Sequence, residues 1–491
     1  MSSNGHLTAA KLHARLSHPI IDADGHWIEY GPLVRQHLKR IGGDQAVTGF
    51  GLFGHQVMRD LSISVAERRH KRIGQEAWWS LPTKNTRDRA TATMPRLLYK
   101  RMEELGLDFA VLYPSAGLGL PRIPDAAMRA VTCRAFNTFT ADYFQQFSDR
   151  ITPAAVVPMH TPEEAIAEVE HVVKQLGLKV ILLGSMVRRP IPAHLDKHPD
   201  MAETAVWFDP LGLDSEHDYD PLWAKCVELG VSPTFHTPSR GFGFRISPSN
   251  FTYNHIGHFA MAHEPVCKAL FLGGVTRRFP SLKFGFLEGG VGWACQLYAD
   301  LVGHWKKRNA EALAEVDPRN LDHALFQQLA EQYGDADLVA ALQHKAAKRG
   351  GVVHLDGLYA VGGINNLDDY AACEIARPED LRDLFVENFY FGCEADDPMN
   401  AWAFNRRGNP FKAQMRTLFG SDIGHFDVVN MTEVLPEAYE LVEDELISEN
   451  DFRDFTFANA ARFWGEANPN FFKGTAVEDA AATVLAGGNK R

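Results

Sequence analysis

The sequence predicts a (β/α)8 TIM barrel, an α/β fold in which eight parallel strands alternate with helices. Short apolar runs of strand type alternate along the chain with segments of helical spacing, an order typical of a parallel sheet. Eight such runs can be counted, and several end in an acid or a histidine. Active sites of this barrel class lie at the C-terminal strand ends, so these residues are expected to face one site.

The strand predictions follow the apolar runs and cover residues 20–29, 108–114, 151–159, 178–183, 231–236, 282–288, 388–394 and 417–422. Helical spacing predicts helices over residues 97–105, 126–147, 162–176 and 221–229. Gly106, Gly177 and Gly230 follow three of these helices, and glycine commonly ends a helix. A last helix over 451–463 is expected to pack on the outside of the barrel.

Two long segments are predicted as additions to the barrel. Residues 31–95 show no steady period and are expected to form a cap after strand 1. Residues 305–384, between strands 6 and 7, are too long for one crossover and suggest a helical lid or an oligomer contact. The barrel with both additions is predicted to occupy 1–472. Residues 473–491 are expected to form a C-terminal tail, loosely ordered or exchanged with a neighbouring subunit.

The composition excludes several classes of function. The 491 residues carry a formal net charge of −12, and without a long basic run neither nucleic acid nor an anionic membrane is an expected partner. The start of the chain lacks a signal-peptide pattern, and no apolar run spans a bilayer, so a cytoplasmic location is expected. The six cysteines form no CxxC pair and are expected to be reduced thiols.

The first strand carries side chains that bind metals. Asp22, Asp24 and His26 alternate and so share one face, and Glu29 follows just past the strand end. An exposed acidic turn would give the same local pattern, but other strand ends add His236, Glu288, Glu394 and Asp422. Clustered buried carboxylates raise one another's pKa values unless a cation holds them together. The set therefore predicts a site for a divalent metal.

On these residues the chain resembles the amidohydrolase superfamily, in the amidohydrolase-related branch that includes aminocarboxymuconate semialdehyde decarboxylase. The resemblance is carried by residues 21–26, 271–293 and 419–425. It implies metal ligands at His26, His236 and Asp422, and at Asp24, where the branch usually has a histidine. Glu288 stands where the branch usually has a catalytic histidine.

Both departures from the branch replace nitrogen by carboxylate oxygen. Mixed shells of histidine and carboxylate suit Fe and Mn, and Zn also accepts them. With Glu29, Glu394 and His258 as further candidate ligands, two ions are predicted, bridged by Asp24 or Asp422. This form of the fold is similar to a group of amidohydrolase-type monooxygenases with di-iron or Mn/Fe centres. The favoured hypothesis is a monooxygenase that uses dioxygen to hydroxylate a small acid or amino acid.

Three alternatives stay open. A metal-hydroxide hydrolase would use Asp422 as general base and His236 to polarise the substrate. A nonoxidative decarboxylase of a small carboxylate would need Glu288 to replace the usual histidine. A supporting subunit would keep the metal and assist a paralogous barrel, and either a homo-oligomer or such a hetero-oligomer is expected.

Other residues have assigned roles with open alternatives. Arg240 and Arg245 are candidates to clamp a substrate carboxylate, although surface arginines are commoner and either one could pair with Glu288. His425 is expected to contact substrate or to orient Asp422. Of the histidines His255 and His258, which have helical spacing, His258 is expected to face the site. Glu394 could instead begin a solvated loop.

Overall fold

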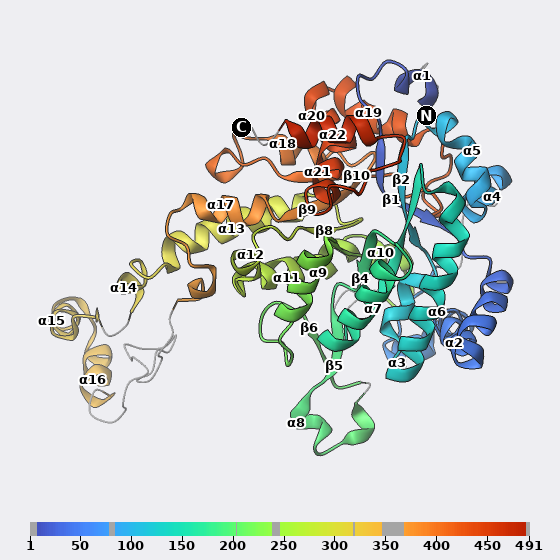
Figure 1. The fold of residues 1–491 in the computed structure, drawn as a ribbon. Coiled ribbons are helices and arrows are strands. Elements are labelled where there is room, and N and C mark those ends of the chain that lie inside the picture. The colour runs from blue at the N-terminus through green and yellow to red at the C-terminus, as the bar shows by residue number, and fades with distance from the viewer. Residues whose placement is uncertain are drawn as a thin grey trace.

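The computed structural model describes residues 7–77, 84–202, 204–237, 246–317, 320–345 and 368–487. Eight parallel strands are hydrogen-bonded in the order β1 (Ile21–Trp27), β2 (Phe109–Pro114), β3 (Ile151–Val157), β4 (Val180–Leu183), β7 (Pro233–Phe235), β8 (Phe284–Phe286), β9 (Phe389–Glu394) and β10 (Arg416–Gly420). Each predicted strand range overlaps one of them. Figure 1 shows the strands at the centre of the molecule with helices around them.

Backbone hydrogen bonds bring the first and last strand ends together. The N–H of Asp422 donates to the carbonyl of Asp24 at 3.0 Å, and the N–H of His26 donates to the carbonyl of Ile423 at 2.9 Å. The sheet is thus a nearly closed barrel, and the predicted (β/α)8 fold is confirmed. The contacts lie at the C-terminal strand ends, where this fold carries its chemistry.

The predicted helices are also present, as α5 (Pro95–Leu105), α6 (Ala126–Phe144), α7 (Pro162–Lys174) and α9 (Asp220–Leu229). In α5, Leu98, Met102 and Leu105 are buried on one face, the 3–4 spacing of an amphipathic helix. Gly106 ends α5 at φ 71°, in the left-handed region that glycine adopts without steric cost. Further helices of the outer layer are α11 (His258–Leu272), α12 (Val275–Arg278), α13 (Gly292–Arg308), α17 (Glu379–Val386) and α19 (Val434–Glu443).

The segment after β1 is mostly helical in its described part. It forms α2 (Gly31–Ser62), α3 (Val65–Lys71) and α4 (Thr86–Thr93). Gly43 interrupts α2 with a non-helical backbone, φ 66° and ψ −159°, which changes the direction of the buried face. This break explains why the sequence shows no steady period there. The cap boundaries predicted from sequence stay a prediction.

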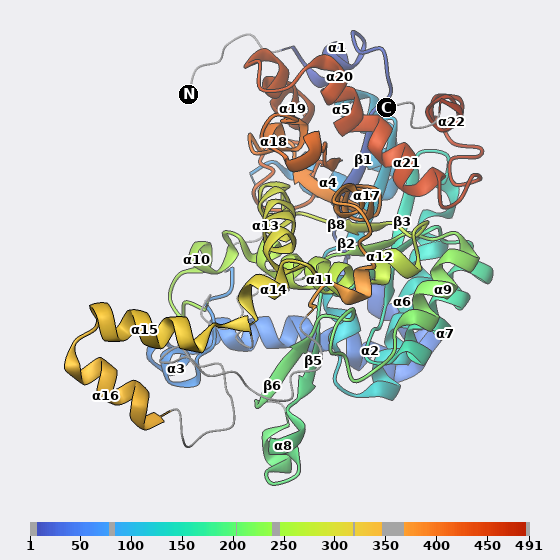
Figure 2. The ribbon, with the colours of Figure 1, turned by 90° about the vertical axis from the view of Figure 1, so that its left-hand side faces the viewer.

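The long connection from β8 to β9 is helical where the structure describes it. After α13 it forms α14 (Leu313–Val316), α15 (His323–Tyr333) and α16 (Ala336–Lys345), and it returns through α17. In Figures 1 and 2 the helices α15 and α16 lie away from the barrel. The helical character expected for residues 305–384 is therefore present in this part, whereas a lid or oligomer role stays a prediction.

Two elements differ from the sequence-based expectation. No strand or helix was predicted for residues 184–219, but they contain the antiparallel pair β5 (Val187–Pro190) and β6 (Val206–Asp209), with α8 (Pro192–Leu195) between them. The expected loose tail instead forms α22 (Glu478–Ala486), whose Ala481 and Val484 are buried. This helix packs on α21 (Asn459–Gly465) of its own chain, because apolar residues recur at helical spacing along it.

Shorter helices lie between these elements. They include α1 (Ala9–His13), the 3-10 helix η1 (Gly117–Arg122), α10 (Phe251–His255), α18 (Asn400–Phe404) and α20 (Glu449–Arg453). All six cysteines are buried and free of disulfide bonds. Among the helices in the described ranges, none is both long and apolar enough to cross a membrane.

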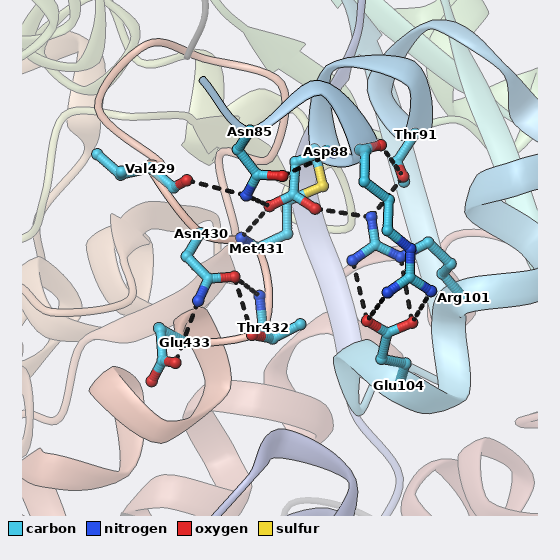
Figure 3. Close-up of polar contacts among 11 residues, drawn as sticks. Asn85, Asp88, Thr91, Arg101, Glu104, Val429, Asn430, Met431, Thr432 and Glu433 are labelled. Carbon is cyan, nitrogen blue, oxygen red and sulfur yellow. Dashed lines mark hydrogen bonds and ion pairs between the residues drawn. The ribbon is translucent and has the colours of Figure 1, made fainter. Parts of the chain in front are cut away.

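A buried ion pair joins the segment before β2 to the loop after β10 (Figure 3). Arg101 of α5 donates to Asp88 of α4 at 2.7 Å, and both side chains are buried. The other oxygen of Asp88 accepts the N–H of Met431 at 2.8 Å. Because the loop after β10 starts at Asp422, this pair helps to hold the site in place.

Replacing Arg101 by Met is expected to lower the free energy of unfolding by about 3 kcal/mol, because Asp88 then keeps a buried charge without its cation. Urea unfolding followed by tryptophan fluorescence measures the loss. The matched control is Arg87→Met, since Arg87 pairs with Glu104 at the surface and such pairs contribute below about 1 kcal/mol. Equal losses in the two variants would contradict a structural role for the buried pair.

Candidate metal centre

Side chains from four strand ends converge on one buried region. Two groups have ligand atoms that all lie within 4.8 Å of one another. One group consists of Asp24, His26 and His236, and the other consists of His26, Glu288, Asp422 and His425. His26 belongs to both groups. These residues come from β1, from the ends of β7 and β8, and from the turn after β10.

The first group is built around two imidazoles. The Nε2 atoms of His26 and His236 lie 3.2 Å apart. Asp24 Oδ1 lies 3.6 Å from His26 Nε2 and 3.8 Å from His236 Nε2. All three side chains are buried. Two imidazole nitrogens and a carboxylate oxygen aimed at one point form a donor set that suits a divalent cation.

The second group adds two carboxylates and a third imidazole. Asp422 Oδ1 lies 2.6 Å from His425 Nδ1 and 3.5 Å from His26 Nε2. Glu288 Oε1 lies 3.8 Å from His425 Nδ1, and its Oε2 lies 3.0 Å from His236 Nε2. Glu288 therefore connects the two groups. His425, expected from sequence to contact substrate or to orient Asp422, stands among the potential ligands.

The polar atoms of this centre are incompletely satisfied by the described protein. Within the described ranges, Asp24 Oδ1 is buried without a hydrogen-bond partner, and the polar neighbours of Glu288 Oε2 and Asp422 Oδ1 include nitrogens of His236 and His425, which are potential ligands themselves. Buried polar atoms of this kind are rare and costly, and an ion is one way to satisfy them. This observation indicates that the residues fit a divalent metal.

Burial also shifts the pKa values of the acids and histidines in this centre. Burial, followed by the charges of neighbouring acids, raises the pKa values of Asp24, Glu288 and Asp422 well above their usual range. Burial lowers the pKa values of His26 and His236 well below theirs. Neutral imidazole is the form that binds a metal, and a bound cation restores the ionised carboxylates.

Backbone geometry turns two of the carboxylates inward. Glu288 and Asp422 have φ values of 58° and 48°, a left-handed conformation that is uncommon outside glycine. Such backbone strain is found most often at functional sites. Gly424, at φ 98°, continues the second turn, and a Cβ there would lie 2.8 Å from the carbonyl oxygen of His26. Only glycine fits this close approach.

Residues not assigned from sequence support the ligands. The oxygens of Asp22 accept the backbone N–H of Ser421 at 2.9 Å and its hydroxyl at 2.6 Å. The buried His263 lies 2.8 Å from Ser185 Oγ through Nδ1 and 2.7 Å from the carbonyl of Leu287 through Nε2. These bonds fix the residues that immediately precede Asp422 and Glu288. Of these supporting residues, Asp22 could have been predicted from sequence, because it lies on the same face of the first strand as Asp24 and His26.

Three predicted ligands lie outside both groups. The oxygens of Glu29 accept the backbone N–H groups of Ala116 and Gly117 at 2.9 and 2.7 Å, so this carboxylate holds the start of η1. Glu394 ends β9, and burial, followed by the charge of Asp427, raises its pKa to about 7. His258 is buried at the start of α11 and packs against Phe259. The ligand roles of Glu29, Glu394 and His258 stay predictions.

The remaining predicted contacts have different outcomes. His255 packs against the rings of Phe251 and Phe426, which places it among aromatic residues. Arg240 and Arg245, with their proposed carboxylate clamp and their possible pairing with Glu288, lie outside the described residues.

Asp422→Asn is expected to lower the metal content per chain by at least about tenfold, because it removes a buried ligand charge. Elemental analysis after dialysis against a mild chelator measures the content, and circular dichroism checks that the variant folds. Glu29→Gln is the matched control and is expected to keep wild-type metal, since its oxygens face backbone N–H groups. Full metal retention by Asp422→Asn would remove this residue from the ligand set.

Comparison with known proteins gives one family match. The family model described as amidohydrolase (Amidohydro_2) matches residues 21–349. The decarboxylase OrsB of Emericella nidulans is 30% identical over 189 residues, which are 36% of this chain and 50% of that protein. The chain thus spans about half the length of this curated relative.

Several solved structures are similar at low identity. The 5-carboxyvanillate decarboxylase LigW of Sphingomonas paucimobilis is 14% identical, with a TM-score of 0.48 and coverage of 91% of this chain and 99% of that chain. The 4-oxalomesaconate hydratase LigJ of Rhodopseudomonas palustris is 15% identical, with a TM-score of 0.43 and coverage of 95% and 99%. The family-model match covers most of the barrel and includes the Asp24, His26, His236 and Glu288 positions. The chain belongs to the amidohydrolase family.

Proposed function

We propose that this chain is a divalent-metal enzyme that acts on a small carboxylate substrate without oxygen, by decarboxylation or by hydrolysis. The observation that supports it most is the position of Glu288. This acid stands among the potential ligands, 3.0 Å from His236, and completes the site with a group that can move a proton. The 189-residue similarity to a decarboxylase supports the same reaction class.

Asp24, His26, His236 and Asp422 would hold the ion. Their mixture of nitrogen and oxygen donors suits Mn, Fe or Zn. A divalent ion bound there supplies Lewis-acid polarisation of a substrate oxygen. Asp422 and His236 also lie where the hydrolase alternative needs a base and a polarising group.

Glu288 would carry the proton. In decarboxylation, the bond between the substrate carbon and the carboxyl carbon breaks, the electron pair stays on the substrate carbon, and the substrate carbon takes a proton as carbon dioxide leaves. In hydrolysis, the leaving group needs one. Glu288 is not one of the four residues assigned to the ion, and its Oε2 lies 3.0 Å from His236 Nε2, so its carboxyl group is placed beside the ion to pass this proton to the substrate. In this proposal Glu288 replaces the catalytic histidine that the amidohydrolase-related branch usually has.

Metal-loaded protein is expected to turn over its substrate under nitrogen as fast as in air. A panel of aromatic and aliphatic carboxylates, followed by carbon dioxide release and by product chromatography, tests this. Glu288→Gln is expected to lower kcat at least about a hundredfold, the usual contribution of an acid–base group. Glu228→Gln on the exposed face of α9 serves as control. Turnover that requires oxygen would exclude the nonoxidative proposal.

A monooxygenase is the second candidate, and the two overlapping ligand groups favour it. They offer three carboxylates and three imidazoles around the shared His26. This number of donors is sufficient for two ions, and carboxylate-rich sites suit Fe and Mn. Hydroxylation of a small acid or amino acid by dioxygen would then be the reaction.

Elemental analysis of protein expressed with Fe, Mn and Zn all available separates the two candidates. The second candidate predicts close to two ions per chain, rich in Fe or Mn, and substrate-dependent uptake at an oxygen electrode. A single ion per chain with no oxygen uptake would eliminate it. Association with a second copy or with a paralogous barrel, which a supporting subunit needs, stays a prediction for size-exclusion chromatography.

A further inference from the structure

A cavity of about 540 Å³ lies apart from the metal centre. Its walls come from the second half of α2, the chain just after α3, η1, the β5–β6 pair and the chain after β7. Figure 2 shows α2, α3 and β5–β6 in the same part of the molecule. The residues that line it include none of the two ligand groups. Its volume is in the range of small-molecule binding sites.

The charged side chains of this cavity are mainly cationic. They are four arginines and two acids, namely Arg59, Arg72, Arg122, Arg188, Asp60 and Glu76. Arg59 and Asp60 are neighbours, with 3.5 Å between Nε and Oδ1. The cavity therefore carries an excess of positive charge in a chain whose net charge is −12. Guanidinium groups bind carboxylates with two parallel hydrogen bonds.

The rest of the lining is largely apolar. Phe53, Leu120, Ile123, Phe208 and Ile246 contribute carbon surface from four separate segments. A hydrated inorganic ion gains nothing from such surface, whereas an organic anion buries its carbon body against it. The lining thus distinguishes an amphiphilic anion from a simple one.

One wall is built before any ligand binds. The buried guanidinium of Arg68 donates to Gln75 Oε1 at 2.6 Å and to the carbonyl of Pro248 at 2.8 Å. The buried Asn254 donates to the carbonyl of Gln75 at 3.1 Å and accepts the N–H of Ser247 at 2.6 Å. Gln75 and Asn254 both line the cavity. A wall fixed in this way lowers the ordering cost of binding.

We propose that this cavity binds a monocarboxylate with an apolar aliphatic or aromatic body. Arg122 of η1 and Arg188 of β5 are the residues assigned to the carboxylate, because they come from separate elements that line one space. The apolar residues hold the body. The site is independent of the reaction at the metal centre and needs no ion.

Isothermal titration of the chain with octanoate tests the proposal, on protein that carries its metal and on the same protein after chelation, with circular dichroism to show that the chelated chain stays folded. One octanoate is expected to bind per chain, and octanol, which has the same body without the charge, is expected to bind at least tenfold more weakly. Arg122→Gln with Arg188→Gln should weaken octanoate at least tenfold, since each lost contact involves a charged group. The single variant Arg188→Gln, at an exposed strand position, carries the test if the double variant does not fold.

Arg406→Gln is the matched control, because Arg406 is exposed, bonds Gln414 and lies outside the cavity. It should bind octanoate as wild type does. Wild-type affinity in Arg188→Gln and in the double variant would overturn the proposal. So would binding that appears only after metal loading, which would place the carboxylate at the metal centre. Arginine-dependent binding of inorganic phosphate in preference to octanoate would overturn the assigned ligand class.

Discussion

The buried carboxylate of Asp22 connects the first strand of the barrel to the turn after the last strand, and the metal centre depends on this connection. It accepts the backbone N–H and the hydroxyl of Ser421 and also the N–H of Asp24, the last at 3.2 Å. Asp24 is one of these donors and Asp422 follows Ser421, so the side chain of Asp22 helps to position two potential ligands that are far apart in sequence. Burial raises the pKa of Asp22 to about 6, while its hydrogen bonds act in the opposite direction.

The centre built on this connection is unfavourable for the protein alone. Asp24, Glu288 and Asp422 are buried close together, and two of them stand on left-handed backbone. Their mutual repulsion and lost solvation oppose folding with all three ionised. A cation removes both penalties at once, and for this reason metal binding and folding are expected to be linked. The strain at Glu288 and Asp422 is maintained by the barrel around them.

Sequence patterns predicted the barrel because each strand is a short apolar run whose end coincides with a polar residue. Asp24, His26, His236, Glu288 and Asp422 were identified for the same reason, since position at a strand end determines where they point. His425 was expected to contact substrate or to orient Asp422, and its Nδ1 lies 2.6 Å from Asp422 Oδ1. Its place among the potential ligands depends on the left-handed turn at Asp422, which leaves no periodic signal. The ligand role of Glu29 stays a prediction; its oxygens accept the backbone N–H groups of Ala116 and Gly117, and these contacts across the fold leave no signal in the local sequence.

The strand ends carry the groups for the chemistry, whereas the connections between strands and helices line the cavity proposed to bind the anion. The potential metal ligands lie in β1 or just after the ends of β7, β8 and β10, where the neighbouring strands of the barrel restrict their positions. The arginine-lined cavity is made by α2, η1 and β5–β6, which are connections whose sequences tolerate change. The connections can therefore change while the strand ends keep the metal centre. The excess of arginine that lines the cavity, set against an acidic chain, favours the anionic ligand proposed for the cavity and does not act at the metal centre.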